Sequence, residues 1–136
     1  MWQHQLEIRV RYHETDGQGR VHHAQYLNFF ERGRVEMMRD NGHSYRELEE
    51  SGLLLVVTKF EVEYNLPAAF DDLLICITRV ERARGARIDH TYELWRDRDL
   101  LVKARSEIAC IDRNGVVKRL PHYLQGERTP RSSKSI

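Results

Sequence analysis

Apolar and polar residues alternate along most of this chain, with one long exception in its first third. Over residues 6–12, Leu6, Ile8, Val10 and Tyr12 fall on one side and charged side chains on the other. This two-residue period predicts a half-buried β-strand that runs as far as residue 12.

A helical period replaces the alternation after a polar, glycine-containing segment at residues 13–22. Over residues 24–41 the apolar positions follow the spacing i, i+3, i+4, i+7 and i+11, which predicts a helix with a broad apolar stripe. These positions are Tyr26, Phe29, Phe30, Gly33 and Met37. Gly33 lies within this stripe, where glycine costs about 1 kcal/mol relative to alanine, so we expect another backbone to approach there. A short second helix is predicted over residues 44–50, because Ser44 and the glutamate three residues later form a capping-box pattern.

The rest of the chain has the pattern of β-strands separated by turns. Apolar or alternating runs cover residues 53–66, 73–82, 85–95 and 101–111. One strand, one long helix and then antiparallel strands predict an α+β domain. Because the helix is too apolar to face water, we expect the sheet to wrap around it as one long central helix. Residues 1–125 should form this single domain, and the Ser-, Arg-, Lys- and Pro-rich residues 126–136 a disordered tail.

The amino-acid composition of the chain argues against several classes of function. The chain has 136 residues, 32% of them charged, and a formal net charge of +1. It therefore lacks the basic excess typical of nucleic-acid or membrane-surface binders, and no nucleic-acid partner is expected. Neither a signal-peptide pattern nor a membrane-length apolar run occurs, which predicts a cytoplasmic location without membrane insertion. Cys76 and Cys110 lie in apolar runs, which favours buried, reduced thiols.

The polar segment before the long helix holds the candidate chemistry. Asp16 lies there among glycines and histidines. A helix N-terminus has unpaired backbone N–H groups that can polarise a carbonyl and stabilise an oxyanion, and a nearby carboxylate can attack that carbonyl or activate water. The segment therefore has the components of acyl-group hydrolysis. The alternative is that Asp16-Gly17 is only a turn and the histidines are surface residues.

Metal and nucleotide sites are not predicted in this segment. His13, His22 and His23 lack the ligand spacing of a metal site. The glycines at residues 17 and 19 lack the third glycine of a dinucleotide fingerprint. No metal or cofactor is therefore expected.

The segment resembles the signature of a known family. From Tyr12 to Glu31 it fits the pattern Tyr-x-x-Thr-Asp-x-x-Gly-x-Val-x-His-x-x-Tyr-Leu-x-Phe-Phe-Glu. This pattern is typical of the 4-hydroxybenzoyl-CoA thioesterase-like hotdog family, particularly its Tol-Pal-associated acyl-CoA thioesterase branch. The resemblance extends over roughly residues 5–120. It implies a hotdog fold and hydrolysis of an acyl-CoA to free acid and CoA.

The resemblance also implies roles for single residues. Asp16 matches the catalytic carboxylate, as nucleophile or as general base, and the backbone N–H of His23 matches the group that polarises the thioester carbonyl. Tyr12 matches a tyrosine that assists catalysis in part of the family. Glu31 matches a position that can contact the acyl group, the alternative being an acid on the helix surface.

An arginine cluster lies at the turn after the strand predicted over residues 73–82. Arg82, Arg84 and Arg87 lie there, and the planar fork of arginine suits phosphate groups. Relatives bind the phosphates of CoA near this turn, so we expect these arginines to bind substrate. The alternative is a solvated hairpin.

Some questions stay open at this point. Gln18, Arg20 and His22 depart from the family pattern beside the carboxylate, so the acyl preference is not predicted. An acyl-carrier-protein thioesterase or a non-catalytic acyl-CoA binding protein would show the same pattern. In the family, subunits join their sheets edge to edge with each active site at the seam. We therefore expect a homodimer, or a homotetramer, which would also cover the exposed sheet edges.

Overall fold

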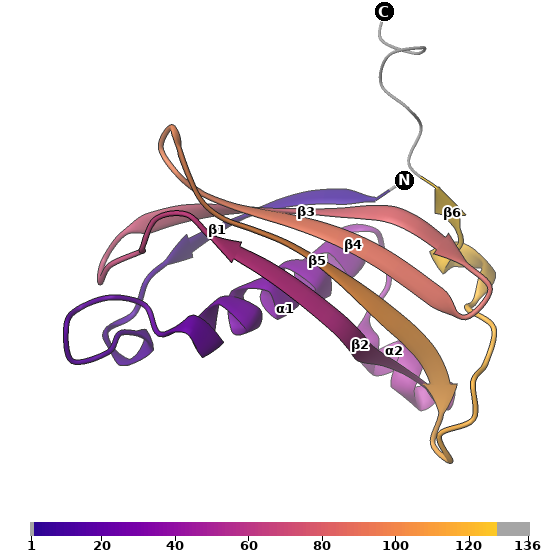
Figure 1. The fold of residues 1–136 in the computed structure, drawn as a ribbon. Coiled ribbons are helices and arrows are strands. Elements are labelled where there is room, and N and C mark those ends of the chain that lie inside the picture. Colours follow the sequence, from indigo (N-terminus) through magenta and orange to yellow (C-terminus); the bar gives the residue numbers. More distant parts are fainter. Residues whose placement is uncertain (1, 128–136) are drawn as a thin grey trace, which may run out of the picture.

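A curved antiparallel sheet covers one long helix in the computed structural model of this chain, which describes residues 2–127 (Figure 1). The elements are, in chain order, β1 (Gln3–Arg9), η1 (Tyr12–Glu14), α1 (His23–Asp40), α2 (Tyr45–Glu50), β2 (Leu53–Tyr64), β3 (Leu73–Arg84), β4 (Arg87–Arg96), β5 (Asp99–Asp112), η2 (His122–Leu124) and β6 (Gly126–Glu127). The predicted α+β arrangement, a sheet around one central helix, is confirmed.

The sheet has the strand order β1-β3-β4-β5-β2, and the short β6 pairs with β3. Every pairing is antiparallel. Strand β2 is 12 residues long and lies at one edge, where no other strand within residues 2–127 covers its outer side. A long open edge of this kind is a template for pairing with another chain.

The apolar stripe of α1 packs into the hollow of the sheet. All five predicted stripe positions are buried: Tyr26, Phe29, Phe30, Gly33 and Met37. Fully burying a side chain such as phenylalanine or methionine contributes about 1.5–3 kcal/mol. The stripe therefore fixes the position of α1, including its N-terminal end, against the sheet.

Gly33 is needed for a reason that differs in detail from the prediction. A Cβ atom at this position would lie 2.4 Å from the hydroxyl oxygen of Thr78 and 3.4 Å from the sulfur of Cys76. The approach is thus made by side chains of β3, and the expectation of a close backbone was wrong. Thr78 is fully buried and β-branched, so its side chain has little freedom to move aside.

A buried polar cluster also ties α1 to the sheet. The Arg34 guanidinium donates a hydrogen bond to the hydroxyl of Tyr92 at 3.0 Å, and that hydroxyl is 2.6 Å from the hydroxyl of Ser106. His90 lies beside them, fully surrounded, and burial lowers its pKa to about 3, with the charge of Arg34 adding to the effect. His90 is therefore neutral in the folded protein.

Two expectations about the ends of elements need correction. Strand β1 ends at Arg9, and Tyr12 begins the turn η1 instead of extending the strand. The carboxylate of the buried Glu14 accepts the backbone N–H of Arg11 at 2.6 Å, which bends the chain although the alternation continues. At the other end, Gly126–Glu127 form β6 on β3, whereas residues 128–136 of the predicted tail lie outside the described residues.

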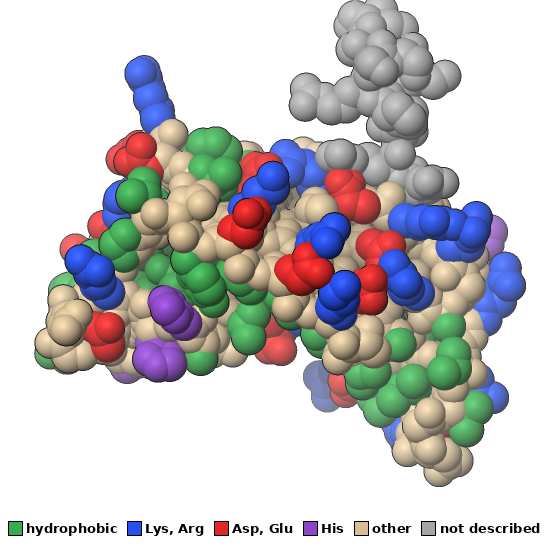
Figure 2. Space-filling view, viewed as in Figure 1, with side chains coloured by type: hydrophobic (Ala, Val, Ile, Leu, Met, Phe, Trp, Pro, Cys, Tyr) green, Lys and Arg blue, Asp and Glu red, His purple; other side chains and the backbone are tan. Residues whose placement is uncertain are grey.

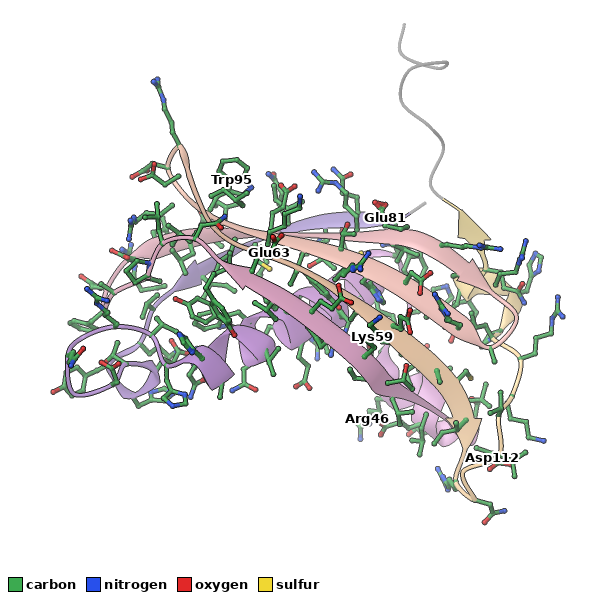
Figure 3. The ribbon with its side chains drawn as sticks, in the orientation of Figure 1. Arg46, Lys59, Glu63, Glu81, Trp95 and Asp112 are labelled. Atoms are coloured by element: carbon green, nitrogen blue, oxygen red, sulfur yellow. The ribbon has the colours of Figure 1, made fainter. Side chains whose placement is uncertain are left out.

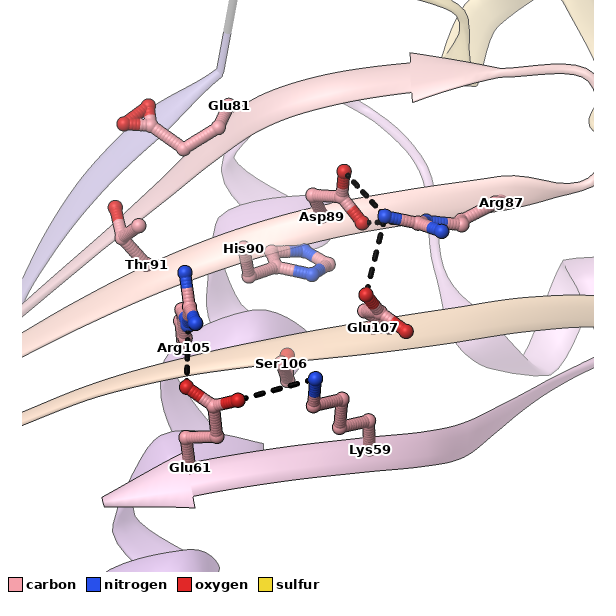
Figure 4. Close-up of a pocket in the computed structure, with 10 residues that line it drawn as sticks. All are labelled: Lys59, Glu61, Glu81, Arg87, Asp89, His90, Thr91, Arg105, Ser106 and Glu107. Carbon is pink, nitrogen blue, oxygen red and sulfur yellow. Dashed lines mark hydrogen bonds and ion pairs between the residues drawn. The ribbon is translucent and has the colours of Figure 1, made fainter.

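The outer face of the sheet is covered by paired charges. Arg105 contacts Glu61 at 2.6 Å, and Arg87 contacts Glu107 at 3.1 Å. Figure 2 shows acidic and basic side chains mixed over this face, and Figure 3 shows Lys59 on it. These pairs line a shallow hollow of about 250 Å³ (Figure 4). The charges neutralise one another and leave no uniform patch.

No helix within residues 2–127 is long and apolar enough to cross a membrane. The cytoplasmic location stays a prediction.

Candidate active site

The loop that carries Asp16 is a tight turn fixed by the backbone. The N–H of Asp16 donates to the carbonyl of Arg20 at 2.7 Å, and the N–H of Gly19 donates to the carbonyl of Asp16 at 3.1 Å. Gly19 has a φ of +82°, a conformation that side chains disfavour. A β-bridge between Arg20 and Ala69 anchors the turn to the chain that follows β2. The position of Asp16 is therefore well defined although its side chain is exposed.

The carboxylate of Asp16 is held as an anion. Its Oδ1 accepts the backbone N–H of Gln18 at 2.8 Å and that of Arg20 at 3.2 Å. The hydrogen bond from Gln18 is the main reason that the pKa of Asp16 lies below its usual value, and the backbone N–H and the charge of Arg20 lower it further. Within residues 2–127 the second oxygen accepts no hydrogen bond, so it is open to a substrate or a water molecule.

Helix α1 begins beside this carboxylate and leaves one backbone amide free. His22 is the N-cap, and its Nδ1 accepts the N–H of Ala24 at 3.2 Å. The N–H of Gln25 donates to the carbonyl of His22 at 2.9 Å. The N–H of His23 has no acceptor among the described residues, and the helix dipole makes this end partially positive. The family resemblance implies that this amide polarises the thioester carbonyl, and that role stays a prediction.

These groups share one cavity of about 430 Å³ at the helix start. Its walls include Asp16, Arg20, His22, His23, Tyr64 and Pro67. Figure 2 shows histidine side chains on the surface at this end of the molecule, where α1 begins in Figure 1. A carboxylate and an open amide therefore line a cavity large enough for an acyl group.

Two tyrosines that sequence reasoning did not assign hold this end of the helix. The ring of Tyr64 stacks on the imidazole of His23 with 4.5 Å between the centroids, and its hydroxyl donates to the His23 carbonyl at 3.4 Å. The hydroxyl of the buried Tyr26 accepts the N–H of Ala68 at 3.1 Å. Tyr26 belongs to the family pattern, but the only signal for Tyr64 was its apolar phase in the second strand of the sequence, β2.

Tyr12 and Glu31 lie outside the cavity walls in a single chain. The side chain of Tyr12 is 77% exposed, and its ring packs edge-on against Phe70 with 5.5 Å between the centroids. Glu31 is exposed on α1, about two turns beyond the helix start. Their assisting and acyl-binding roles stay predictions.

The arginine cluster lies at the β3–β4 turn, at the end of the sheet opposite to the Asp16 loop (Figure 1). Arg82, Arg84 and Arg87 line a hollow of about 240 Å³ together with Asp89. Arg82 and Arg84 form no ion pair within residues 2–127, whereas Arg87 contacts Asp89 at 2.8 Å (Figure 4). One chain by itself does not bring this cluster to Asp16.

The described residues offer no group of three or more His, Cys, Asp or Glu side chains that could hold a metal ion. Cys76 and Cys110 are both buried and unpaired by a disulfide, as predicted. Burial raises the pKa of the Cys76 thiol to about 11, so it is protonated and a poor nucleophile. Asp16 is therefore the best candidate for the reacting group.

Comparison with known proteins identifies the family. A model of the thioesterase-like superfamily matches residues 10–127. The chain belongs to the thioesterase-like superfamily. The acyl-CoA thioesterase YbgC of Haemophilus influenzae is 41% identical over 106 residues, which cover 77% of this chain and 78% of that protein. The acyl-CoA thioester hydrolase YbgC of Escherichia coli O6:H1 is 37% identical over 106 residues, covering 77% and 79%.

Solved structures agree with this membership of the thioesterase-like superfamily. The DHNA-CoA thioesterase of Staphylococcus aureus matches with a TM-score of 0.85 and 29% identity, covering 90% of this chain and 84% of that one. The hotdog fold and the family predicted from residues 12–31 are thereby confirmed. The superfamily match includes the Asp16 turn, the start of α1 and the whole sheet apart from β1.

Proposed function

We propose that this chain hydrolyses acyl-CoA thioesters to a free acid and CoA. One observation carries the proposal: the ionised carboxylate of Asp16 and the free N–H of His23 line the same cavity of about 430 Å³. Relatives at 37–41% identity that are named as acyl-CoA thioesterases or thioester hydrolases support the substrate class.

The reaction follows from these two groups. The thioester carbonyl oxygen accepts the N–H of His23, which stabilises the negative charge that develops on this oxygen. In the general-base route, Asp16 takes a proton from water, the oxygen of that water adds to the carbonyl carbon, and the C–S bond breaks. The CoA sulfur leaves with the proton from Asp16. In the nucleophilic route, Asp16 itself adds to the carbonyl carbon, CoA leaves, and water then hydrolyses the mixed anhydride.

A homodimer would complete this site. The cavity lies beside Tyr64, at the end of the edge strand β2. Arg87 is in register with Ala109 and thereby with Val56, near the start of β2. If two β2 edges pair antiparallel about a twofold axis, the start of one strand faces the end of the other. The arginine cluster of one subunit then approaches the cavity of its partner, where Arg82, Arg84 and Arg87 would bind the phosphates of CoA.

A thiol-release assay on a panel of acyl-CoA esters tests the proposal, with matched acyl-carrier-protein thioesters as a second arm. We expect release of CoA thiol, and faster turnover of acyl-CoA than of the matched carrier-protein ester. Faster turnover of the carrier-protein ester would show that the acyl-carrier-protein ester is the preferred substrate. Tight CoA binding without thiol release from any ester would show a binding protein and overturn the proposal.

Single-turnover hydrolysis in ¹⁸O-labelled water tests for the nucleophilic route. If water opens the mixed anhydride at the Asp16 carbonyl carbon, the acid of the first turnover carries one unlabelled oxygen from the enzyme, which the general-base route cannot give. If water attacks the acyl carbonyl carbon instead, the acid carries the labelled oxygen in both routes, and trapping of the anhydride has to separate them.

A further inference from the structure

Arg20 is a free cation in the wall of the candidate active site. It lines the cavity that Asp16 and His23 share. Its guanidinium forms no ion pair or hydrogen bond within residues 2–127, whereas Arg87 and Arg105 are held by carboxylates.

The backbone fixes where this cation can reach. The N–H of Arg20 donates to Asp16 Oδ1 at 3.2 Å, and the carbonyl of Arg20 accepts the N–H of Asp16 at 2.7 Å. The two residues therefore belong to one rigid turn. The guanidinium does not pair with Asp16, although its charge helps to lower the pKa of that carboxyl. It is close to the reacting group and still has its donors available.

The charges of the cavity indicate which acyl groups it suits. Asp16 would repel an acyl group that ends in a carboxylate, unless a cation compensates for it. Arg20 is the one permanently charged cation among the described residues that line the cavity. Its planar fork matches a carboxylate in a bidentate manner. Leu66 and Pro67 provide an apolar part of the wall, against which the methylene groups of a short chain can pack.

We infer that the cavity accepts acyl groups that end in a carboxylate, that is, CoA monothioesters of short dicarboxylic acids, with Arg20 binding the terminal carboxylate. This inference rests on the proposed function, since Asp16 and the N–H of His23 act on the thioester carbonyl at the other end of the same acyl group. Water adds, the C–S bond breaks, and the products are a dicarboxylic acid and CoA, so no further reactant is needed. Short chains fit because Asp16 and Arg20 belong to the same turn.

Matched substrates test this inference. We would measure kcat/KM for succinyl-CoA against butyryl-CoA, and for glutaryl-CoA against pentanoyl-CoA, after subtraction of the rate without enzyme. The wild type should prefer the carboxylate-bearing member of at least one pair. Arg20→Leu should lower kcat/KM for that ester by roughly 10- to 100-fold, the usual effect of losing hydrogen bonds between charged groups, and should change the apolar ester by less than about threefold. Arg20→Lys should restore part of the preference.

Arg98→Leu is the matched control, because Arg98 is also exposed but does not line the cavity. It should leave both rates unchanged. An equal loss on both esters in Arg20→Leu, or no preference in the wild type, would overturn the inference while hydrolysis itself continued. Absence of hydrolysis with every ester would instead refute the proposed function.

Discussion

Two turns of this chain share the same pattern of backbone hydrogen bonds, yet only one of them belongs to the candidate active site. Asp16 and Asp112 each accept the N–H two residues later at 2.8 Å. Each also accepts the N–H four residues later, at 3.2 Å for Asp16 and 3.0 Å for Asp112. The glycine three residues later, Gly19 or Gly115, has a φ of +82° in both turns. The two carboxylates are therefore held in nearly the same way.

The pKa of both carboxyl groups is lowered for the same reason, but the two carboxylates face different parts of the molecule. Backbone N–H groups lower the pKa of both carboxyls, chiefly that of Gln18 for Asp16 and that of Val116 for Asp112. Asp112 lies at the far end of β5 (Figure 3), in a hairpin. Asp16 instead lines a cavity together with the start of α1. The comparison teaches that an ionised, well-held aspartate is a property of the turn, whereas the chemistry depends on what faces it.

Exchanging each carboxylate for an amide gives the largest expected difference between the turns. Asparagine keeps the Oδ1 acceptor and therefore the turn, but it can neither attack a carbonyl nor take a proton. Asp16→Asn should lower kcat by about 10²–10⁴-fold, while Asp112→Asn should leave it within about twofold of the wild type. Thiol release and thermal unfolding of both variants check this. Comparable losses in the two variants would contradict the special role of the Asp16 turn.

Replacing the glycine of each turn tests whether activity depends on the geometry of the Asp16 turn. A Cβ at Gly19 or Gly115 has no neighbouring atom within 4 Å, so the strain comes only from the positive φ. Each glycine-to-alanine variant should lose about 1–2 kcal/mol of unfolding free energy. Only Gly19→Ala should also lower kcat/KM, because a shifted turn misplaces Asp16. Denaturant unfolding and the thiol-release rate, measured on both proteins, separate the two effects.

Acid titration should give a smaller effect on activity than these substitutions. It compares the ionisation of the Asp16 carboxylate with that of the buried His90. Because the pKa of Asp16 is lowered, the carboxylate stays ionised as the pH falls, and activity should persist below the usual carboxyl pKa of about 3.9, provided the fold survives.

His90 limits how far this titration can be followed. Its pKa is about 3 in the folded protein and about 6.5 in an unfolded chain. Between these values the unfolded state binds more protons, so stability is lost as the pH falls from about 6.5 towards 3, by up to about 1.4 kcal/mol per pH unit. His90→Gln should flatten this part of the curve of unfolding free energy against pH. An unchanged slope would contradict the buried, neutral state of His90.

Much of this arrangement could be predicted from the sequence because it depends on local patterns. The helical spacing of Tyr26, Phe29 and Phe30 predicted the buried face of α1, and all three are buried. The Asp16-Gly17 pair was interpreted both as a turn and as a catalytic segment. The turn is observed, and the catalytic role is what we propose.

The remainder depends on contacts that a local pattern does not contain. Tyr64 stacks on His23 because the sheet register brings the end of β2 to the start of α1, a relation between residues 41 positions apart. Tyr12 lies in η1 and not in the predicted strand, because the carboxylate of Glu14 accepts the N–H of Arg11 and bends the chain there. The distance between the arginine cluster and the Asp16 loop also follows only from the three-dimensional arrangement of the sheet.

The central claim is that the free N–H of His23 stabilises the oxyanion, and removal of that single hydrogen tests it most directly. Proline suits the first helical position, and the preceding residue, His22, already has the extended conformation that proline requires, with φ −67° and ψ 141°. The measurement is kcat for His23→Pro relative to His23→Ala, which loses the same imidazole but keeps the N–H. We predict that the proline variant is slower by about 10²–10³-fold and equally well folded. Equal kcat values in the two variants would contradict the account.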